Sequence, residues 1–277
     1  MKNKFLLVAI SLLLISFSSC SDNIGDYHPK KKISRIFSDY GYGKTLQEMW
    51  SWNKNQLVKI EHSSDWTEYF TYNKKGQIVR VDDYEYGEYV EYQYDGNKLK
   101  KIRYYNDNTL EEEYSVTYDG NHPSKIELTY YVGYKGKSRL KSEGTNPLKT
   151  LLSGNVYQRI ERKFNEYSAA SKSDGYTYII KLEWEKGNIS KVIYEEIEDG
   201  EHNIEEVTFK YDNKSNPFHN CLSLYLDDFV DENWGSKNNV VEEFWTGTSV
   251  TYSYIYDGNY PIEQRSNNGY FKYYEYE

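Results

Sequence analysis

One short unit recurs along most of this chain. It consists of an aromatic residue, any residue, a second aromatic and a polar residue, followed by a Gly- or Asn-rich turn and an aliphatic–basic–aliphatic segment. The clearest copy runs from Tyr92 to Ile102 as YQYDGNKLKKI. Asp-Gly and Gly-Asn accept the positive φ that tight turns between antiparallel strands require. Each unit therefore predicts a β-hairpin, and copies are centred on the second aromatics Trp52, Tyr72, Tyr94, Tyr118, Trp184, Tyr211 and Tyr256.

The residues that flank these turns alternate with the period of two that is typical of strands. In the third copy Val90, Tyr92 and Tyr94 share one face, while Glu91 and Gln93 lie on the other. The alternation predicts a sheet with tyrosine, valine and isoleucine turned inward and charged residues outward. An acidic strand tends to precede each turn and a basic strand follows it, so neighbouring strands can pair opposite charges.

Two stretches, residues 135–175 and 216–240, interrupt the pattern. The remainder of a domain spanning 37–277 has room for about sixteen strands of ordinary length. We therefore predict an all-β fold, an antiparallel up-and-down meander of short strands. Closure into a water-soluble barrel, round or flattened, removes the exposed edge strands that an open sheet would carry.

The first nineteen residues predict a secretory signal. Lys2 and Lys4 precede the apolar run 5–15, which is too short to span a bilayer. The segment then ends in Ser18-Ser19-Cys20, which resembles the lipobox of bacterial lipoproteins, where the cysteine is acylated and becomes the new N-terminus. The resemblance implies a lipid anchor at Cys20 and a flexible tether over 20–36. An ordinary signal peptide followed by an incidental cysteine is the alternative.

The residues after the anchor favour the cell surface. Ser21 and Asp22 resemble the surface-export signal of Bacteroidota lipoproteins, with a periplasm-facing protein as the alternative. Removal of 1–19 leaves 32 basic and 43 acidic side chains, a net charge of −11. That balance argues against nucleic acid, which needs a basic footprint, and against a protein face lying on anionic lipid. The expected contact with the membrane is the lipid anchor alone.

The Tyr-Asp-Gly-Asn units resemble the YD repeats of RHS-type proteins. Together with the lipobox, an Asn216-Pro217-Phe218 segment and a later GSKNN segment at 235–239, they make the chain similar to a Bacteroidota lipoprotein family of unknown function with a porin-like fold. The resemblance implies an antiparallel barrel and no particular activity. A true pore is disfavoured, because membrane strands need about 9–11 residues with a lipid-facing apolar band.

The sequence contains no recognisable catalytic or metal-binding pattern. No two of the five histidines, at positions 28, 62, 122, 202 and 219, have the spacing of a metal site. Cys221 has no partner but Cys20, so we expect a small buried apolar residue there. The acids Asp227, Asp228, Asp231 and Glu232 lack the order of a calcium loop. We predict no catalytic residue, no metal and no cofactor.

These observations favour a non-enzymatic binding or structural module of the outer membrane, with a glycan or an envelope protein as partner. One alternative is a glycan-binding component of a polysaccharide-utilisation system. For that function Trp234, beside Gly235 in the second interruption, is the best candidate ligand contact, although core packing or strand pairing is the favoured interpretation of such a tryptophan. Another alternative is a carbohydrate-active hydrolase, because 43 acids make some close carboxylate pair inevitable.

Overall fold

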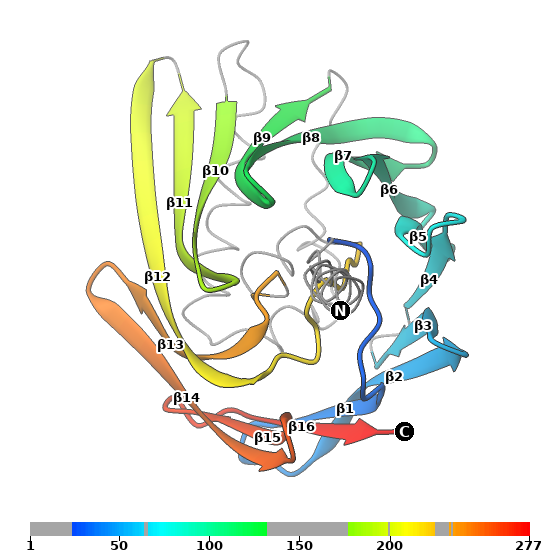
Figure 1. Ribbon diagram of the computed structural model, residues 1–277, viewed down its shortest axis with the longest axis vertical. Helices are drawn as coiled ribbons and strands as arrows, with labels where there is room; N and C mark the ends of the chain where they lie inside the picture. The colour runs from blue at the N-terminus through cyan, green and yellow to red at the C-terminus, as the bar shows by residue number, and fades with distance from the viewer. Residues whose placement is uncertain (1–23, 64–65, 132–176, 199, 225–232, 234) are drawn as a thin grey trace, which may run out of the picture.

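The computed structural model describes residues 24–63, 66–131, 177–198, 200–224, 233 and 235–277. These residues form sixteen β-strands, and each strand pairs antiparallel with the next along the chain. The last strand, β16, pairs with the first, β1, so that the sheet closes on itself (Figure 1). The predicted antiparallel meander and its closure into a barrel are therefore confirmed.

Strand length agrees with the spacing of the repeat only in part. Eight strands have six to eight residues, and the other eight, β2, β7, β8, β9, β10, β11, β12 and β14, have nine to fifteen, so the expectation that every strand is shorter than a membrane strand is wrong. The first eight are β1 (Ile33–Asp39), β2 (Thr45–Asn53), β3 (Gln56–His62), β4 (Thr67–Tyr72), β5 (Ile78–Asp83), β6 (Glu88–Asp95), β7 (Lys98–Asn106) and β8 (Thr109–Asp119). The second eight are β9 (His122–Tyr130), β10 (Thr177–Glu185), β11 (Asn188–Glu198), β12 (Glu201–Ser215), β13 (Asn238–Trp245), β14 (Thr248–Asp257), β15 (Tyr260–Ser266) and β16 (Phe271–Tyr276).

Eight hairpins make up the barrel, one more than the sequence copies indicate. Seven join successive strands, from β2–β3 to β14–β15. The eighth consists of β16 and β1, where Ile33 pairs with Tyr276 and the amide of Glu277 donates to the carbonyl of Lys32 at 2.9 Å. This hairpin is divided between the two ends of the described chain, so a search for contiguous copies misses it.

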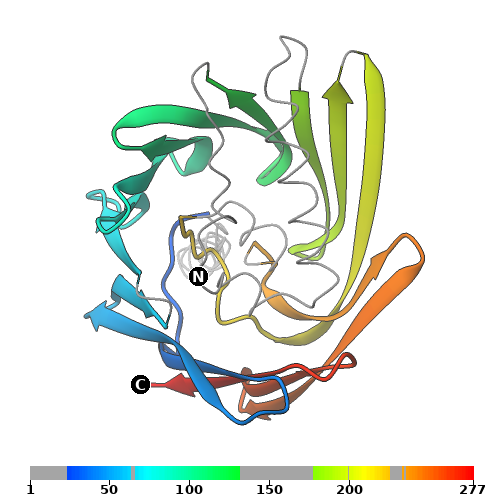
Figure 2. The same cartoon turned by 180° about the vertical axis from the view of Figure 1, so that it is seen from behind.

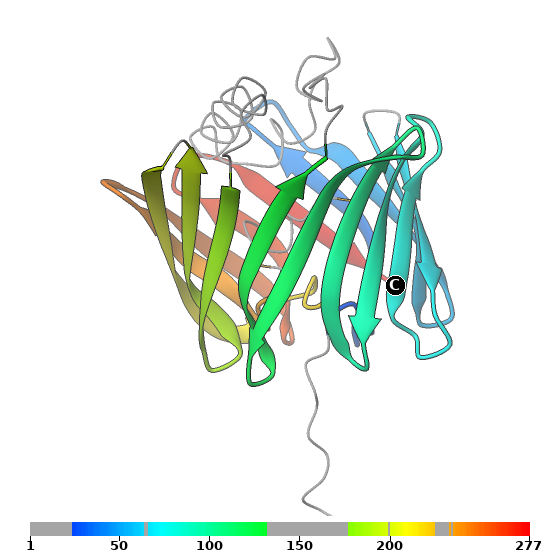
Figure 3. The same cartoon turned by 90° about the horizontal axis from the view of Figure 1, so that it is seen from above.

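The two ends of the barrel differ in their turns. The hairpins of the repeat place their tight turns at one end, which we call the tight-turn end. The turns that connect one hairpin to the next lie at the opposite end (Figures 2 and 3). The Asp-Gly-Asn turns fit their positions because Gly96, Gly120 and Gly258 have φ near +60°, which costs glycine little.

The inner wall is aliphatic and aromatic, as the alternation predicts. The core consists of inward residues from nearly every strand, including Ile60, Val81 and Ile102 at equivalent positions of three hairpins. The outer wall carries ion pairs at about mid-height. Glu113, for example, lies 2.6 Å from both Lys101 and Arg103. Similar outer pairs are Arg35–Glu275, Lys59–Glu61, Arg80–Glu91, Lys125–Glu127, Lys181–Glu195, Lys191–Glu206, Lys210–Glu242 and Arg265–Glu263.

Three sets of described residues lie inside the barrel near the tight-turn end, and we call them the plug: 24–32, 216–224, and 233 with 235–237 (Figure 1). Tyr27 and Cys221 are fully buried there. Residues 24–36 thus belong to the folded barrel, which differs from the expectation of a free tether over 20–36. The second interruption also ends earlier than expected, because β13 begins at Asn238. The first interruption, 135–175, lies outside the described residues.

The described residues contain no helix that is both long and apolar enough to cross a bilayer.

Candidate functional site

The second aromatic of each repeat has a specific partner in the neighbouring hairpin. Tyr72 donates its hydroxyl to the carbonyl of Leu57 at 2.8 Å, and Tyr94 donates to the carbonyl of Ile78 at 2.7 Å. The same bond recurs around the barrel in the pairs Trp52–Ile33, Tyr118–Leu99, Trp184–Pro123, Tyr211–Ile189 and Tyr276–Pro261. We call this set the seam bonds, because each joins one hairpin to the preceding one.

The ladder geometry explains why these bonds form. Between β3 and β4 the ladder pair nearest the tight-turn end is Lys59 with Tyr69. Leu57 lies two residues nearer to that end than Lys59. The carbonyl of Leu57 therefore lies beyond the ladder, and a buried carbonyl without a donor costs about 1–3 kcal/mol. Tyrosine and tryptophan fill the space between the diverging strands and also supply a donor.

Burial at the seams also affects ionisation. Desolvation raises the pKa of Tyr118 to about 12, although its bond to the carbonyl of Leu99 opposes the shift. Desolvation likewise raises the pKa of Tyr72, Tyr94 and Tyr276 well above the ordinary value. The seam tyrosines are therefore held in the neutral form that can donate a hydrogen bond.

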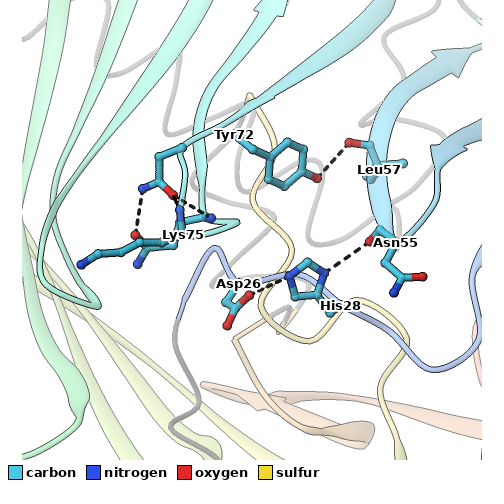
Figure 4. Close-up of polar contacts among 8 residues, drawn as sticks. Asp26, His28, Asn55, Leu57, Tyr72 and Lys75 are labelled. Atoms are coloured by element: carbon cyan, nitrogen blue, oxygen red, sulfur yellow. Dashed lines mark hydrogen bonds and ion pairs between the residues drawn. The ribbon is translucent and has the colours of Figure 1, made fainter.

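The plug is fastened to the inner wall and to itself. Tyr27 packs on Trp50 and Trp52, with ring centroids 6.3 and 5.7 Å away, and donates to the carbonyl of Pro217 at 2.8 Å. At the tight-turn rim, His28 lies 2.9 Å from the carboxylate of Asp26 (Figure 4). Residues 24–32 and 216–224 of the plug, although far apart in sequence, therefore support each other through the bond from Tyr27 to Pro217.

The second part of the plug bonds to several strands. The backbone amide of Leu224 donates to Glu68 of β4 at 3.2 Å, and Tyr92 of β6 donates to the carbonyl of Ser223. On the other side, the hydroxyl of Tyr211 in β12, which donates to Ile189, also lies 2.7 Å from the side chain of Asn233. Glu68 is the second residue of β4 and lies toward the opposite end, so the plug extends from the tight-turn end into the barrel and is a structural part of it.

Toward the opposite end, the inner wall becomes polar. Several inward carboxylates accept a hydrogen bond from an aromatic side chain on the same strand or on the next one. Trp50 donates to Glu48 at 2.6 Å, and Tyr252 donates to Glu243 at 3.1 Å. Glu243 occupies the hairpin position that is Ile60 or Val81 in other repeats. In this part of the interior, some aliphatic positions of the repeat are thus occupied by acids that accept hydrogen bonds from aromatic side chains.

A row of tyrosines crosses the outer wall over β4 to β7, near the opposite end. Tyr69 pairs in register with Asp82, Asp82 with Tyr89, and Tyr89 with Tyr105. The rings of Tyr89 and Tyr105 stack with centroids 4.6 Å apart. Tyr84 packs beside Tyr69 at 5.0 Å and remains 70% exposed. We call Tyr69, Tyr84, Tyr89 and Tyr105 the tyrosine row.

A buried acid and an arginine hold the centre of the tyrosine row. Arg80 donates to Asp82 at 2.6 and 2.8 Å, and its guanidinium carbon lies 3.7 Å from the ring centroid of Tyr89. The hydrogen bond that Arg80 donates to Asp82 raises the pKa of Arg80, which stays cationic. The row therefore combines exposed aromatic faces with a fixed charge, a composition that is common in binding surfaces.

The structure locates some of the residues singled out from the sequence and not others. Cys20 and Trp234 lie outside the described residues, as do Asp227, Asp228, Asp231 and Glu232. Two other tryptophans next to loops, Trp66 and Trp245, are buried in the core. Cys221 is buried in the plug as expected. The described residues contain no group of three or more side chains that suits a metal ion.

Sequence reasoning missed the tyrosine row, although the signal was present. Outward positions of β4 to β7 carry tyrosine where other copies carry charge, and the turn Asp83-Tyr84-Glu85-Tyr86 departs from the repeat. The inward tyrosines, whose period defines the fold, mask these outward tyrosines, which lie out of phase with it.

Comparison with known proteins supports the fold. A solved structure described as a porin-like protein from Bacteroides uniformis is similar to this chain with a TM-score of 0.50. The two share 12% sequence identity, and the match covers 91% of this chain and 100% of the other. No protein-family model and no curated protein sequence matches the chain. The fold is thus that of a porin-like barrel.

Proposed function

We propose that the protein is a lipid-anchored module of the outer membrane, which acts by binding rather than by catalysis. In this proposal residues 1–19 are a signal peptide, Cys20 carries the acyl chains, and the barrel is displayed at the cell surface. Replacement of Cys20 by Ala is expected to release a folded barrel from the membrane fraction. Retention of that variant in the membrane would contradict the anchor.

The outer ion pairs are the observation that carries this proposal. A porin-like shape suggests a membrane-embedded pore, but an Arg or Lys on a lipid-facing wall costs about 2–4 kcal/mol at the bilayer midplane. The outer wall bears Lys101, Arg103 and Glu113 together at mid-height, and similar pairs recur on most other strands. The barrel is therefore proposed to stand in water beside the membrane.

The plug supports the same conclusion from the inside. Tyr27, Phe218 and Cys221 are buried in the interior near the tight-turn end, where a conducting channel would need water. We expect purified protein to give no conductance steps in planar bilayers. Reproducible conductance steps that persist in the Cys20→Ala variant would instead favour a pore.

The non-enzymatic part of the proposal rests on how the described buried acids are used. Asp212 accepts hydrogen bonds from the backbone amides of Lys214 and Asn239, which hold the start of β13. Glu68 accepts from the plug amide of Leu224, and Glu48 accepts from Trp50. Glu48 and Glu68 are buried and Asp212 is half-buried, and each of the three carboxylates has a structural partner.

A glycan-binding role is the second candidate, and the tyrosine row favours it. Exposed aromatic faces stack on sugar rings, and Arg80 with Asp82 supplies polar groups beside them. Binding to a glycan array is expected to be lost in Tyr84→Ala and kept in the control Tyr42→Ala, whose side chain is 98% exposed on another turn. If Trp234→Ala abolishes binding instead, the ligand contacts the residue proposed from the sequence.

A further inference from the structure

The position of the chain before β1 limits how an anchored barrel can stand on a membrane. Gly25 accepts a hydrogen bond at 3.0 Å from the amide of Ile78, the first residue of β5. Ile78 follows directly on the turn at 73–77, so Gly25 lies near the tight-turn rim. His28 lies at the same rim, 3.3 Å from the carbonyl of Asn55 in the β2–β3 turn (Figure 4).

The distance from this point to the proposed anchor is short. Ile24 is four residues after Cys20, and a fully extended chain spans at most about 3.6 Å per residue. The Cα atom of Cys20 therefore lies within about 14 Å of that of Ile24. A lipid on Cys20 would hold the tight-turn rim close to the bilayer surface.

The charges of the two ends also favour the tight-turn end as the one near the bilayer. Exposed lysines gather at the tight-turn end, namely Lys30, Lys54, Lys74, Lys75, Lys186 and Lys237. Acids are also exposed there, but three of them are paired with lysines: Asp257 with Lys31, Glu185 with Lys186 and Glu277 with Lys32. Asp95 and Asp119 are the exposed acids of this end for which the described residues give no ion pair.

The opposite end is predominantly acidic among the described residues. Its rim and nearby turns carry Asp39, Glu85, Glu88, Asp107, Glu111, Glu201 and Glu205, with Lys44 as the exposed lysine. Anionic headgroups attract lysines near a membrane surface and repel acids within about a Debye length. Among the described residues, charge is therefore separated along the barrel axis.

We propose that the tight-turn end is the membrane-facing surface of the protein, with its exposed lysines against anionic phospholipid headgroups, and that the acidic end points away. The inference rests on the proposed anchor at Cys20, and it replaces the expectation from the net charge that the anchor alone contacts the membrane. In this orientation the tyrosine row lies on the outer wall toward the end that faces away from the lipid, where it is accessible to a ligand.

A quenching experiment on the lipidated protein tests this orientation. A fluorophore is attached at Asn97→Cys in a tight turn or at Thr109→Cys at the opposite end, positions that are both exposed. Buried Cys221 does not compete for the label. The residues of β7 between these sites place them roughly 27 Å apart. Vesicles contain phosphatidylcholine with a nitroxide-headgroup lipid, with or without phosphatidylglycerol.

The label at Asn97 is expected to be quenched several-fold more than the label at Thr109. Equal quenching, or stronger quenching at Thr109, would overturn the orientation while leaving the anchor intact. Release of the wild-type protein from the vesicles would overturn the anchor itself. The two failures are therefore distinguishable by sedimentation of the vesicles before fluorescence is read.

Charge variants test the role of the headgroups. Phosphatidylglycerol is expected to raise the ratio of quenching at Asn97 to quenching at Thr109. Replacement of Lys30, Lys74 and Lys237 by Gln is expected to reduce that rise by about fivefold for each lysine. The matched control replaces Lys44, Lys181 and Lys210 by Gln, with the same change in net charge elsewhere on the surface. If both triple variants behave alike, the lysines of the tight-turn end do not contact the headgroups.

Discussion

The half of the barrel at the tight-turn end differs from the opposite half in how closely its residues keep to the repeat. Near the tight-turn end the repeat is regular: Tyr72, Tyr94 and Tyr276 make equivalent seam bonds, and the interior is filled by the plug. Toward the opposite end the inner wall contains acids such as Glu48 and Glu243, and tyrosines appear on the outside. The repeat thus builds the scaffold, and departures from it mark the surfaces available for function.

The largest effect is expected in the plug. Tyr27→Ala removes a fully buried ring from Trp50 and Trp52, together with its bond to Pro217. A truncation of this size lowers the free energy of unfolding by about 3–5 kcal/mol, as measured by chemical denaturation. The control Tyr42→Ala removes an exposed ring and is expected to change stability little. Equal effects of the two substitutions would mean that the plug does not stabilise the barrel.

The next effect concerns the seams. Tyr72→Phe keeps the ring and removes the donor to the carbonyl of Leu57, so the free energy of unfolding is expected to fall by about 1–3 kcal/mol. Tyr94→Phe is expected to behave in the same way. Denaturant unfolding measures both. The matched control is Tyr84→Phe on the outer wall; a loss there as large as at the seams would contradict the special role of the seam bonds.

A smaller effect is expected from the outer ion pairs. Glu113→Gln removes the partner of Lys101 and Arg103, but exposed pairs contribute at most about 1 kcal/mol each. The loss should shrink as salt is added, because screening weakens surface pairs. A salt titration of thermal unfolding compares variant and wild type. A loss that is large and independent of salt would show that Glu113 acts through something other than these charges.

The smallest effect on stability is expected in the tyrosine row. Tyr84→Ala should leave the free energy of unfolding within about 0.5 kcal/mol of wild type, since substitutions of exposed residues usually do. Its expected effect is on ligand binding instead. A large loss of stability would mean that Tyr84 serves the scaffold, and the contrast between the two halves of the barrel would then be weaker.

The regular half is the part that sequence predicts well. A period of two and Asp-Gly or related turns predict seven of the eight hairpins and inward residues such as Val90 and Tyr92, because these depend on local sequence. Closure between β16 and β1 is less visible, since it joins residues about 240 apart. Contacts of that range leave no periodic trace in the sequence.

The plug and the tyrosine row could not be derived in the same way. Nothing in the local pattern of residues 24–32 separates a solvated tether from a segment packed in the interior, because Tyr27 meets Trp50 only after the barrel closes. The tyrosine row depends on lateral register across four strands. The candidate ligand contact Trp234 stays a prediction, as does the anchor at Cys20.

An alkaline titration of the phenol groups tests most directly the claim that seam tyrosines are buried, neutral donors. Their folded pKa values lie above the unfolded value of about 10, so the stability they supply is complete below pH 10 and is lost as the pH rises through the folded values. Each contributes a loss of up to about 1.4 kcal/mol per pH unit in that window.

We expect phenolate absorbance to rise in two phases, with the seam tyrosines ionising only as circular dichroism reports unfolding. Tyr72→Phe should reduce the amplitude of the second phase. Reversible ionisation of all tyrosines in one phase near pH 10, with the barrel still folded, would contradict the account.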